Sequence, residues 1–312
     1  MRACMQIMER ALAALARGEA VLPLRPVVRL PDGSGALAAM PAYIGEPRAL
    51  GVKVISVFPG SQAAPHDSHQ GAVLLFDPGT GSLLAIMDAG AITAARTAAV
   101  SGVATRLLAR ADAGVVALIG SGVQAHSHLA AMCAARAVRE VRVWSRTPAH
   151  AAAFAHDAAA RHGIPVHPAA SARDAVTGAD IVCTVTAATT PVVQGAWLSP
   201  GTHVNAVGSS TADARELDSE VVRRASCWVD RRESAMREAG DLLVPLREGV
   251  IGESHLRGEL GDLILGRIAG RRNEREVTLF KSVGIAVEDV AAAEYVYRQE
   301  AARPGAERIA LG

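Results

Sequence analysis

The sequence predicts an α/β fold in which a doubly wound parallel sheet follows a mainly antiparallel sheet. After Arg110, short apolar strands alternate with helical segments, which indicates parallel strands joined by helices. Before that residue, turn signals such as Pro31-Asp32-Gly33 and Asp77-Pro78-Gly79 separate short apolar or alternating segments, as in hairpins. With 312 residues, half of them apolar, the chain is long enough for two domains and a sizeable core.

The first half is expected to begin with a helix and continue as strands. Apolar residues recur at helical spacing over residues 5–17, and Gly18 is expected to end that helix. Strands are then expected at residues 27–30, 36–40, 50–57, 71–77 and 82–88. An alanine-rich helix over residues 91–108 leads to the second half.

The second half is expected to alternate strictly. Strands are expected at 115–119, 141–144, 166, 181–186, 203–208 and 227–230. Helices are expected at 123–136, 149–162 and 171–177, as helical stretches broken by glycines over 235–270, and at 287–299.

A glycine turn follows the first strand of this second half. Gly120 permits a tight turn, Gly122 lets the backbone approach a pyrophosphate, and Ala125 stands where only a small side chain lets helix and strand pack. The helix beginning at Val123 and Gln124 directs free N–H groups and its positive dipole end at phosphates. This order predicts a dinucleotide site; an ordinary strand-to-helix turn is the alternative.

The tip of the next strand bears on which dinucleotide is bound. An NAD site usually has an acidic residue there to accept a hydrogen bond from the ribose 2′-hydroxyl, whereas a 2′-phosphate favours arginine. This chain has Ser145, Arg146 and Thr147. The tip therefore favours NADPH, with NADH as the other possibility. The alternative interpretation of Arg146 is a solvated residue that starts the next helix.

Composition and charge exclude several classes of protein. The net charge of +1 offers no basic field for nucleic acid. The four cysteines, Cys4, Cys133, Cys183 and Cys227, have no metal-binding spacing, so no metal site is expected and they are interpreted as buried thiols in a reducing cytosol. No apolar stretch is long enough to cross a bilayer and no signal peptide is evident, so a cytoplasmic protein without membrane partners is expected.

Several segments resemble the ornithine cyclodeaminase and mu-crystallin family over nearly the whole chain. The matching segments are Pro23-Leu24-Arg25, Met40-Pro41-Ala42-Tyr43, Gly51-Val52-Lys53, Ser68-His69-Gln70-Gly71, Ile92 to Val100, Gly120 to Ala125, Asn205-Ala206-Val207-Gly208, Glu216-Leu217-Asp218 and Phe280-Lys281-Ser282. The resemblance implies a Rossmann domain (109–283) inserted into an α+β substrate-binding and dimerisation domain (1–108 plus 284–312). A homodimer is therefore expected.

The resemblance also implies a substrate that carries an amino or imino group beside a carboxylate. Arg25, Lys53 and Arg96 match family positions around that carboxylate and the reacting centre, with Arg96 also near the cofactor. Fixed cations suit a carboxylate in a dry cleft, and arginine offers a bidentate fork. On the residues alone, Arg25 in a surface loop and Lys53 as a snorkelling strand lysine remain alternatives.

Other matching residues are expected around the nicotinamide. His69 and Gln70 match a segment that approaches the cofactor from the other domain, although a lone histidine is also a common structural hydrogen-bonding group. Thr186, Val207 and Ser282 follow strand ends, where ligands lie in open α/β sheets. Ordinary loop residues are the alternative for these three.

One departure from the family pattern affects the expected reaction. Ornithine cyclodeaminases resemble one another in an acidic residue just after the Gly208 position, but here Ser209-Ser210-Thr211 follows. Unless Asp213 reaches in from the loop, the base for ammonia loss and ring closure is missing. The resemblance is therefore strongest to the NADPH-dependent imine reductases of the family.

The expected activity is the NAD(P)H-dependent reduction of Δ1-pyrroline-2-carboxylate to L-proline, and of the six-membered Δ1-piperideine-2-carboxylate to L-pipecolate. Lys53 is the expected proton donor, with a pKa lowered by Arg25 and Arg96. Proline or hydroxyproline catabolism is the expected setting. Ornithine cyclodeamination, alanine or amino-acid dehydrogenation, and non-enzymatic binding of a small ligand, as in mu-crystallin, remain the alternatives.

Overall fold

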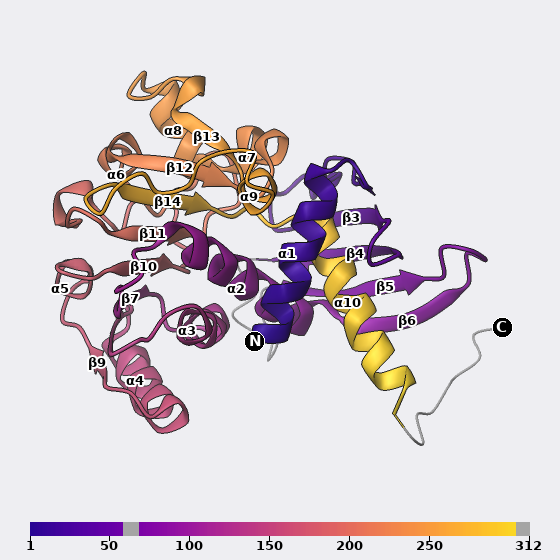
Figure 1. Cartoon of the computed structure of the whole chain (residues 1–312), viewed down its shortest axis with the longest axis horizontal. Coiled ribbons are helices and arrows are strands. Elements are labelled where there is room, and N and C mark those ends of the chain that lie inside the picture. The colour runs from indigo at the N-terminus through magenta and orange to yellow at the C-terminus, as the bar shows by residue number, and fades with distance from the viewer. Residues whose placement is uncertain (59–68, 304–312) are drawn as a thin grey trace.

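The computed structural model describes residues 1–58 and 69–303, and it contains two sheets that flank a layer of helices (Figure 1). The layer consists of α1 (Arg2–Ala16), α2 (Ala89–Leu108) and α10 (Ala286–Ala301). α1 packs against α2 and α10, and α10 also covers strands of the antiparallel sheet. The predicted fold class, a doubly wound parallel sheet beside an α+β part, is confirmed.

The antiparallel sheet contains six strands in the order β1-β3-β4-β5-β6, with β2 pairing at the side with β3. They are β1 (Ala20–Val21), β2 (Val27–Arg29), β3 (Ala36–Ile44), β4 (Ala49–Val57), β5 (His69–Phe76) and β6 (Leu83–Asp88). β3 continues through Pro41 to Ile44, beyond the strand expected at 36–40, because β4 pairs with its whole length. The two-residue β1 was not predicted.

Side chains alternate along β3 between two environments. Ala38, Met40, Ala42 and Ile44 are buried, whereas the residues between them keep part of their surface exposed. This period of two is that of a strand with one face on the core. The buried face meets α10, which carries the residues that complete the candidate site.

The parallel sheet contains eight strands in the order β13-β12-β14-β11-β10-β7-β8-β9. They are β7 (Val115–Ile119), β8 (Glu140–Trp144), β9 (Val166–Pro168), β10 (Ile181–Thr184), β11 (His203–Ala206), β12 (Ala225–Val229), β13 (Leu256–Glu259) and β14 (Val277–Lys281). The strand order reverses direction between β7 and β10. This switch point is where open α/β sheets bind ligands.

Helices connect most of these strands. They are α3 (Val123–Ala135), α4 (Pro148–His162), α5 (Ala172–Val176), α6 (Ser219–Arg224), α7 (Arg232–Glu238), α8 (Gly240–Arg247) and α9 (Leu260–Ile264), with short 3-10 turns at Gly195–Trp197 and Glu253–His255. No helix of the described residues is both long and apolar enough to cross a membrane.

The expectation of helices alone over 235–270 is wrong, and two strands were missed. β13 lies within that segment, and β14, which no strand prediction covered, lies between β11 and β12. A segment with five charged residues and Asn273, from Arg271 to Glu276, precedes β14 and obscures its short apolar pattern. Its central place comes from pairing with distant strands on both sides, which local sequence does not reveal.

One apolar core joins the two sheets. Trp228 of β12 and Phe280 of β14 belong to the same cluster as Met8, Val100 and Val290 from the three layer helices. Burying one such side chain contributes roughly 1.5–3 kcal/mol. The layer helices therefore fix the antiparallel sheet against the carboxyl ends of the parallel strands, while the division into the two domains given above stays a prediction.

Candidate active site

The glycine turn lies at the switch point of the parallel sheet. Gly120 has φ +115°, and a Cβ there would come within 2.9 Å of the Val185 carbonyl oxygen of the neighbouring strand end. A side chain is therefore excluded on both conformational and steric grounds. The Gly120 N–H donates to the Trp144 carbonyl, which ties the turn to the end of β8.

The backbone beyond this turn is open to a ligand. A Cβ on Gly122 would meet nothing within 4 Å, and no side chain caps α3, which starts at Val123. Val123 is 60% exposed, whereas Ala125 is buried against the sheet. An accessible helix N-terminus with a small residue facing the strand fits a bound pyrophosphate.

The tip of β8 fits an adenine ribose that carries a phosphate. Arg146 and Thr147 are exposed and Ser145 is partly exposed. Arg146 forms no ion pair with any residue that the structure describes. An exposed guanidinium without an acidic neighbour suits a phosphate group better than a bare hydroxyl.

The ends of β10 and β11 are joined by a buried carboxylate that the sequence did not single out as a site residue. The Glu216 Oε1 accepts hydrogen bonds from the Thr186 N–H and hydroxyl at 2.6 and 2.8 Å, and its Oε2 accepts from the Gly208 N–H at 2.7 Å. Burial, followed by the nearby Asp241, raises the pKa of Glu216. Thr186 and the segment Val207-Gly208 therefore lie side by side, while their place beside a nicotinamide stays a prediction.

A second buried pair lies directly behind this loop. The Lys281 ammonium is 3.1 Å from the Asp241 carboxylate and donates to the carbonyls of Ala206 at 3.2 Å and Ser209 at 2.5 Å. Asp241 in turn accepts the N–H groups of Glu216 and Leu217. The two pairs fix the backbone that follows β11.

The three predicted cations converge, but each is paired with an acid that the sequence analysis did not identify. Lys53 of β4 donates to Asp289 at 2.9 Å, and Arg96 of α2 donates to Asp289 at 2.8 Å and to Glu288 at 2.5 Å. All four side chains are buried. The bidentate fork expected for a substrate carboxylate is thus occupied by α10, and Arg96 retains only its remaining N–H groups.

Arg25 bridges from the loop between β1 and β2 to the parallel half. It donates to Glu238 of α7 at 2.9 Å and to the carbonyls of Val283 and Gly284 at 3.2 and 3.0 Å. Its side chain is 20% exposed, so it remains accessible. Ser282, one residue before this contact, is buried with its hydroxyl 3.5 Å from Asp230.

The pKa of Lys53 is lowered, as expected, but the main cause is not the one predicted. Burial is the largest contribution, Asp289 opposes it, and Arg96 and Arg25 lower the pKa further, so the pKa of Lys53 falls from 10.5 to about 8. The like charge of the arginines was predicted as the cause, but it is secondary to desolvation. A lysine with this pKa is largely protonated at neutral pH and can still release its proton.

Other predicted positions lie at the edge of this arrangement. His69 begins β5 opposite Val57, and its side chain is outside the described part of the chain, as is Ser68; Gln70 is exposed. Asp213 does not reach the site, because it is 86% exposed and pairs with Arg247. The loop after Gly208 therefore brings no carboxylate of its own to the substrate, while the buried Ser209 hydroxyl donates to the Ala214 carbonyl.

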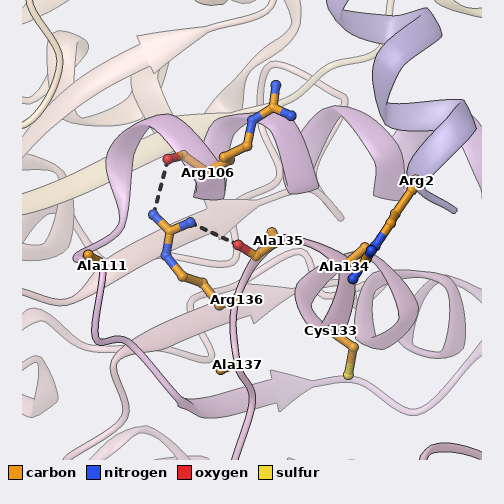
Figure 2. A pocket seen from close by; sticks show the side chains of 8 residues that line it. All are labelled: Arg2, Arg106, Ala111, Cys133, Ala134, Ala135, Arg136 and Ala137. Carbon is orange, nitrogen blue, oxygen red and sulfur yellow. Dashed lines mark hydrogen bonds between the residues drawn. The ribbon is translucent and has the colours of Figure 1, made fainter.

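A surface hollow lies away from these residues, beside the carboxyl-terminal ends of α2 and α3 (Figure 2). It has a volume of about 610 Å³ and is lined by Arg2, Arg106, Arg136 and Cys133, among others. Arg136 donates to the carbonyls of Arg106, Ala109, Arg110 and Ala135, so it caps helix ends. None of the predicted site residues lines this hollow.

The cysteines differ in their burial. Cys183 and Cys227 are buried as predicted, and burial raises the pKa of each thiol to about 12. Cys4 and Cys133 are partly exposed, so the expectation that all four are buried is wrong. Within the part of the chain that the structure describes, no group of three His, Cys, Asp or Glu side chains could hold a metal ion.

The fold and the site together define a dinucleotide-binding protein of the Rossmann class, in which the turn after β7 and an open helix end meet at the switch point. The model of the ornithine cyclodeaminase/mu-crystallin family matches residues 1–303. The chain belongs to that family.

Curated relatives and solved structures agree with this assignment. The ketimine reductase mu-crystallin of Mus musculus is 43% identical over 293 residues, covering 93% of this chain and 90% of the relative. A Δ1-pyrroline-2-carboxylate reductase of Bacillus cereus is 38% identical over 305 residues, covering 96% of this chain and 94% of the relative.

Two solved structures are similar over almost their whole length. The Δ1-pyrroline-2-carboxylate reductase of Thermococcus litoralis, in complex with NADH and L-proline, is 40% identical with a TM-score of 0.95 and covers 98% of this chain and 95% of that one. An archaeal alanine dehydrogenase dimer with bound NAD is 31% identical with a TM-score of 0.93 and covers 99% and 94%.

Proposed function

We propose that this protein is an NAD(P)H-dependent reductase of cyclic imino acids that converts Δ1-pyrroline-2-carboxylate to L-proline and accepts Δ1-piperideine-2-carboxylate. The observation that carries the proposal is the buried Lys53, whose pKa of about 8 suits a proton donor, beside Arg25 and Arg96. The reductase names of the similar mouse, Bacillus and Thermococcus proteins support it.

Each residue has a role that follows from its surroundings. When bound, a nicotinamide cofactor would supply the hydride for the imine carbon. Arg25, the most accessible of the three cations, holds the substrate carboxylate, assisted by the free N–H groups of Arg96. Lys53 keeps the imine nitrogen protonated, because an iminium accepts hydride far better than a neutral imine.

The cofactor residues hold the dinucleotide at three places. Gly120, Gly122, Val123 and Gln124 receive the pyrophosphate, and Ser145 to Thr147 receive the ribose. Thr186, Val207 and Ser282 would surround the nicotinamide, together with His69 and Gln70 of β5 and Arg96 of α2. The exposed Arg146 favours NADPH over NADH.

The antiparallel sheet suits a homodimer. On the face opposite α10, apolar residues remain partly exposed, among them Leu37, Tyr43, Val52, Leu74 and Ile86. Leu37 is 48% exposed and Ile86 59%. A contiguous apolar face of this kind indicates an interface, and the similar archaeal alanine dehydrogenase is a dimer.

The proposed setting is cytoplasmic proline or hydroxyproline catabolism.

Steady-state oxidation of NADPH by the purified protein tests the activity. The cyclic imino acids should be reduced, whereas pyruvate with ammonia should be a poor substrate and ornithine should release no ammonia. Reduction of pyruvate with ammonia in preference to the rings would instead identify an amino-acid dehydrogenase. Ammonia release from ornithine without net redox change would identify a cyclodeaminase, and tight ligand binding without turnover a binding protein.

A further inference from the structure

The chain contains only two lysines, Lys53 and Lys281, among 32 basic residues. Both are buried, and each forms an ion pair with a buried aspartate. Arginine serves every other cationic position, so lysine is not the default basic residue of this chain. Lysine differs from arginine in one property that matters here: a buried lysine can lose its proton within the working pH range, whereas an arginine cannot.

Asp289 is the group on which the cations of the proposed site converge. It lies in the first turns of α10, and it accepts from Lys53 Nζ of β4 at 2.9 Å and from Arg96 Nε of α2 at 2.8 Å. Its side chain is fully buried. One carboxylate therefore holds together three elements that are far apart in the sequence.

The charged groups around Lys53 act in opposite directions. Asp289 faces it from α10, Arg96 and the hydroxyl of Thr93 from α2, and Arg25 from the loop before β2. Its cross-strand neighbours in β3 and β5, Met40 and Val73, are apolar. The Asp289 carboxylate thus opposes burial and the two arginines by favouring the charged form of Lys53.

We infer that Asp289 is a positioning residue of the proposed reduction. It keeps the Lys53 ammonium protonated and fixed in place when water is excluded from the site. The inference rests on the proposed function. Glu288 has a different part, since it contacts Arg96 and the Ile285 N–H and does not contact Lys53. Removal of the Asp289 charge should therefore shift the pH dependence of turnover together with the proton affinity of Lys53, whereas a purely structural ion pair would change stability and leave the pH dependence of turnover in place.

The small number of lysines permits a direct test on the full-length protein. Labelling with [ε-¹³C]lysine gives two signals, which Lys53→Met assigns, and a pH titration of the Lys53 signal reports its proton affinity without any turnover. In Asp289→Asn the titration midpoint should fall by about one pH unit or more, as expected when a buried cation loses its counter-ion. The alkaline limb of kcat/KM for the cyclic imino acid should move down by the same amount.

Controls separate this inference from general damage and from the proposed function. Glu294→Gln removes an acid from the same helix that pairs with Arg298, and it should leave both midpoints unchanged. Asp289→Glu keeps the charge, so the titration midpoint of Lys53 should stay near that of the wild type even if kcat falls. This variant replaces Asp289→Asn in the test if Asp289→Asn does not fold. An alkaline limb of kcat/KM that does not follow the Lys53 midpoint in Asp289→Asn overturns the inference, as does an unchanged Lys53 midpoint. If only Asp289→Glu folds, a lower midpoint in that variant overturns it. A wild-type protein that reduces no cyclic imine overturns the proposed function instead.

Discussion

Lys281 and Asp241 form an ion pair of 3.1 Å in which both side chains are completely buried. Breaking such a pair on one side leaves an uncompensated charge in the interior, at a cost of roughly 3–5 kcal/mol. Lys281→Met should therefore lower the free energy of unfolding by about that amount, as measured by urea denaturation.

The double variant Lys281→Met/Asp241→Asn provides the matched comparison. It leaves no unpaired charge and keeps an oxygen that accepts the N–H groups of Glu216 and Leu217, so it should recover most of the loss. The exposed pair of Arg303 and Glu300 gives a second control, since Arg303→Ala should change stability hardly at all. If the double variant were as unstable as Lys281→Met, the lost hydrogen bonds of Lys281 to the loop, and not the unpaired charge, would be the cause.

Glu216 predicts a specific defect in cofactor binding. Replacement by Gln places an NH₂ group against N–H donors of Thr186 or Gly208, so one of these backbone groups loses its acceptor. A charge-assisted hydrogen bond of this kind contributes about 1.5–3 kcal/mol, so the KM for NADPH should rise by roughly tenfold to a hundredfold. Steady-state kinetics with varied NADPH measure this.

The KM for the imino acid should change less than that for NADPH in Glu216→Gln, because the proposed site has these loops at its cofactor end. Glu220→Gln, an acid that pairs with Arg223 on the surface, is the control and should bind NADPH normally. An unchanged KM for NADPH in Glu216→Gln would separate the loop ends from the nicotinamide site.

The sequence revealed the binding framework better than the partners of its charged groups. The strand over 115–119 and the glycine turn follow from local patterns, whereas the approach of Lys53 to Arg96 was implied by the resemblance to the family. Glu288, Asp289 and Glu238 were missed, because tertiary packing of α7 and α10 alone brings them to the cations. A signal existed for two of them: Glu288-Asp289 interrupts an apolar helical segment from Ile285 to Ala293, and buried acids need cationic partners.

Arg146 predicts the cofactor preference. Arg146→Asp would repel the 2′-phosphate and accept a hydrogen bond from a ribose hydroxyl, so kcat/KM for NADPH should fall by about a hundredfold or more while that for NADH is retained. Paired assays with the two cofactors measure the ratio. Arg173→Asp, an exposed arginine of α5, is the charge-matched control, and equal losses with both cofactors in Arg146→Asp would remove Arg146 from the phosphate site.

The wild-type pH profile follows from the sign of the Lys53 shift. Because burial lowers the pKa of Lys53 to about 8, the donor is protonated below that pH and loses its proton above it. The kcat/KM for the imino acid should therefore be retained toward neutral pH and fall tenfold per pH unit well above pH 8, with stability measured in parallel. An alkaline limb near the usual 10.5 of lysine would show that another group donates the proton.

Leu74 predicts how the proposed dimer forms. It lies on the partly exposed face of the antiparallel sheet, between Val52 and Ile86 on the neighbouring strands. In a two-fold symmetric interface Leu74→Asp introduces two buried charges at once, so the dissociation constant should rise by at least about a hundredfold. Sedimentation equilibrium should show a dimer for the wild type and a monomer for Leu74→Asp. Val250 is 37% exposed in the turn after α8, which lies beside the parallel sheet on the other side of the layer helices (Figure 1), so Val250→Asp should remain dimeric. A Leu74→Asp variant that stays dimeric at low concentration would place the interface elsewhere.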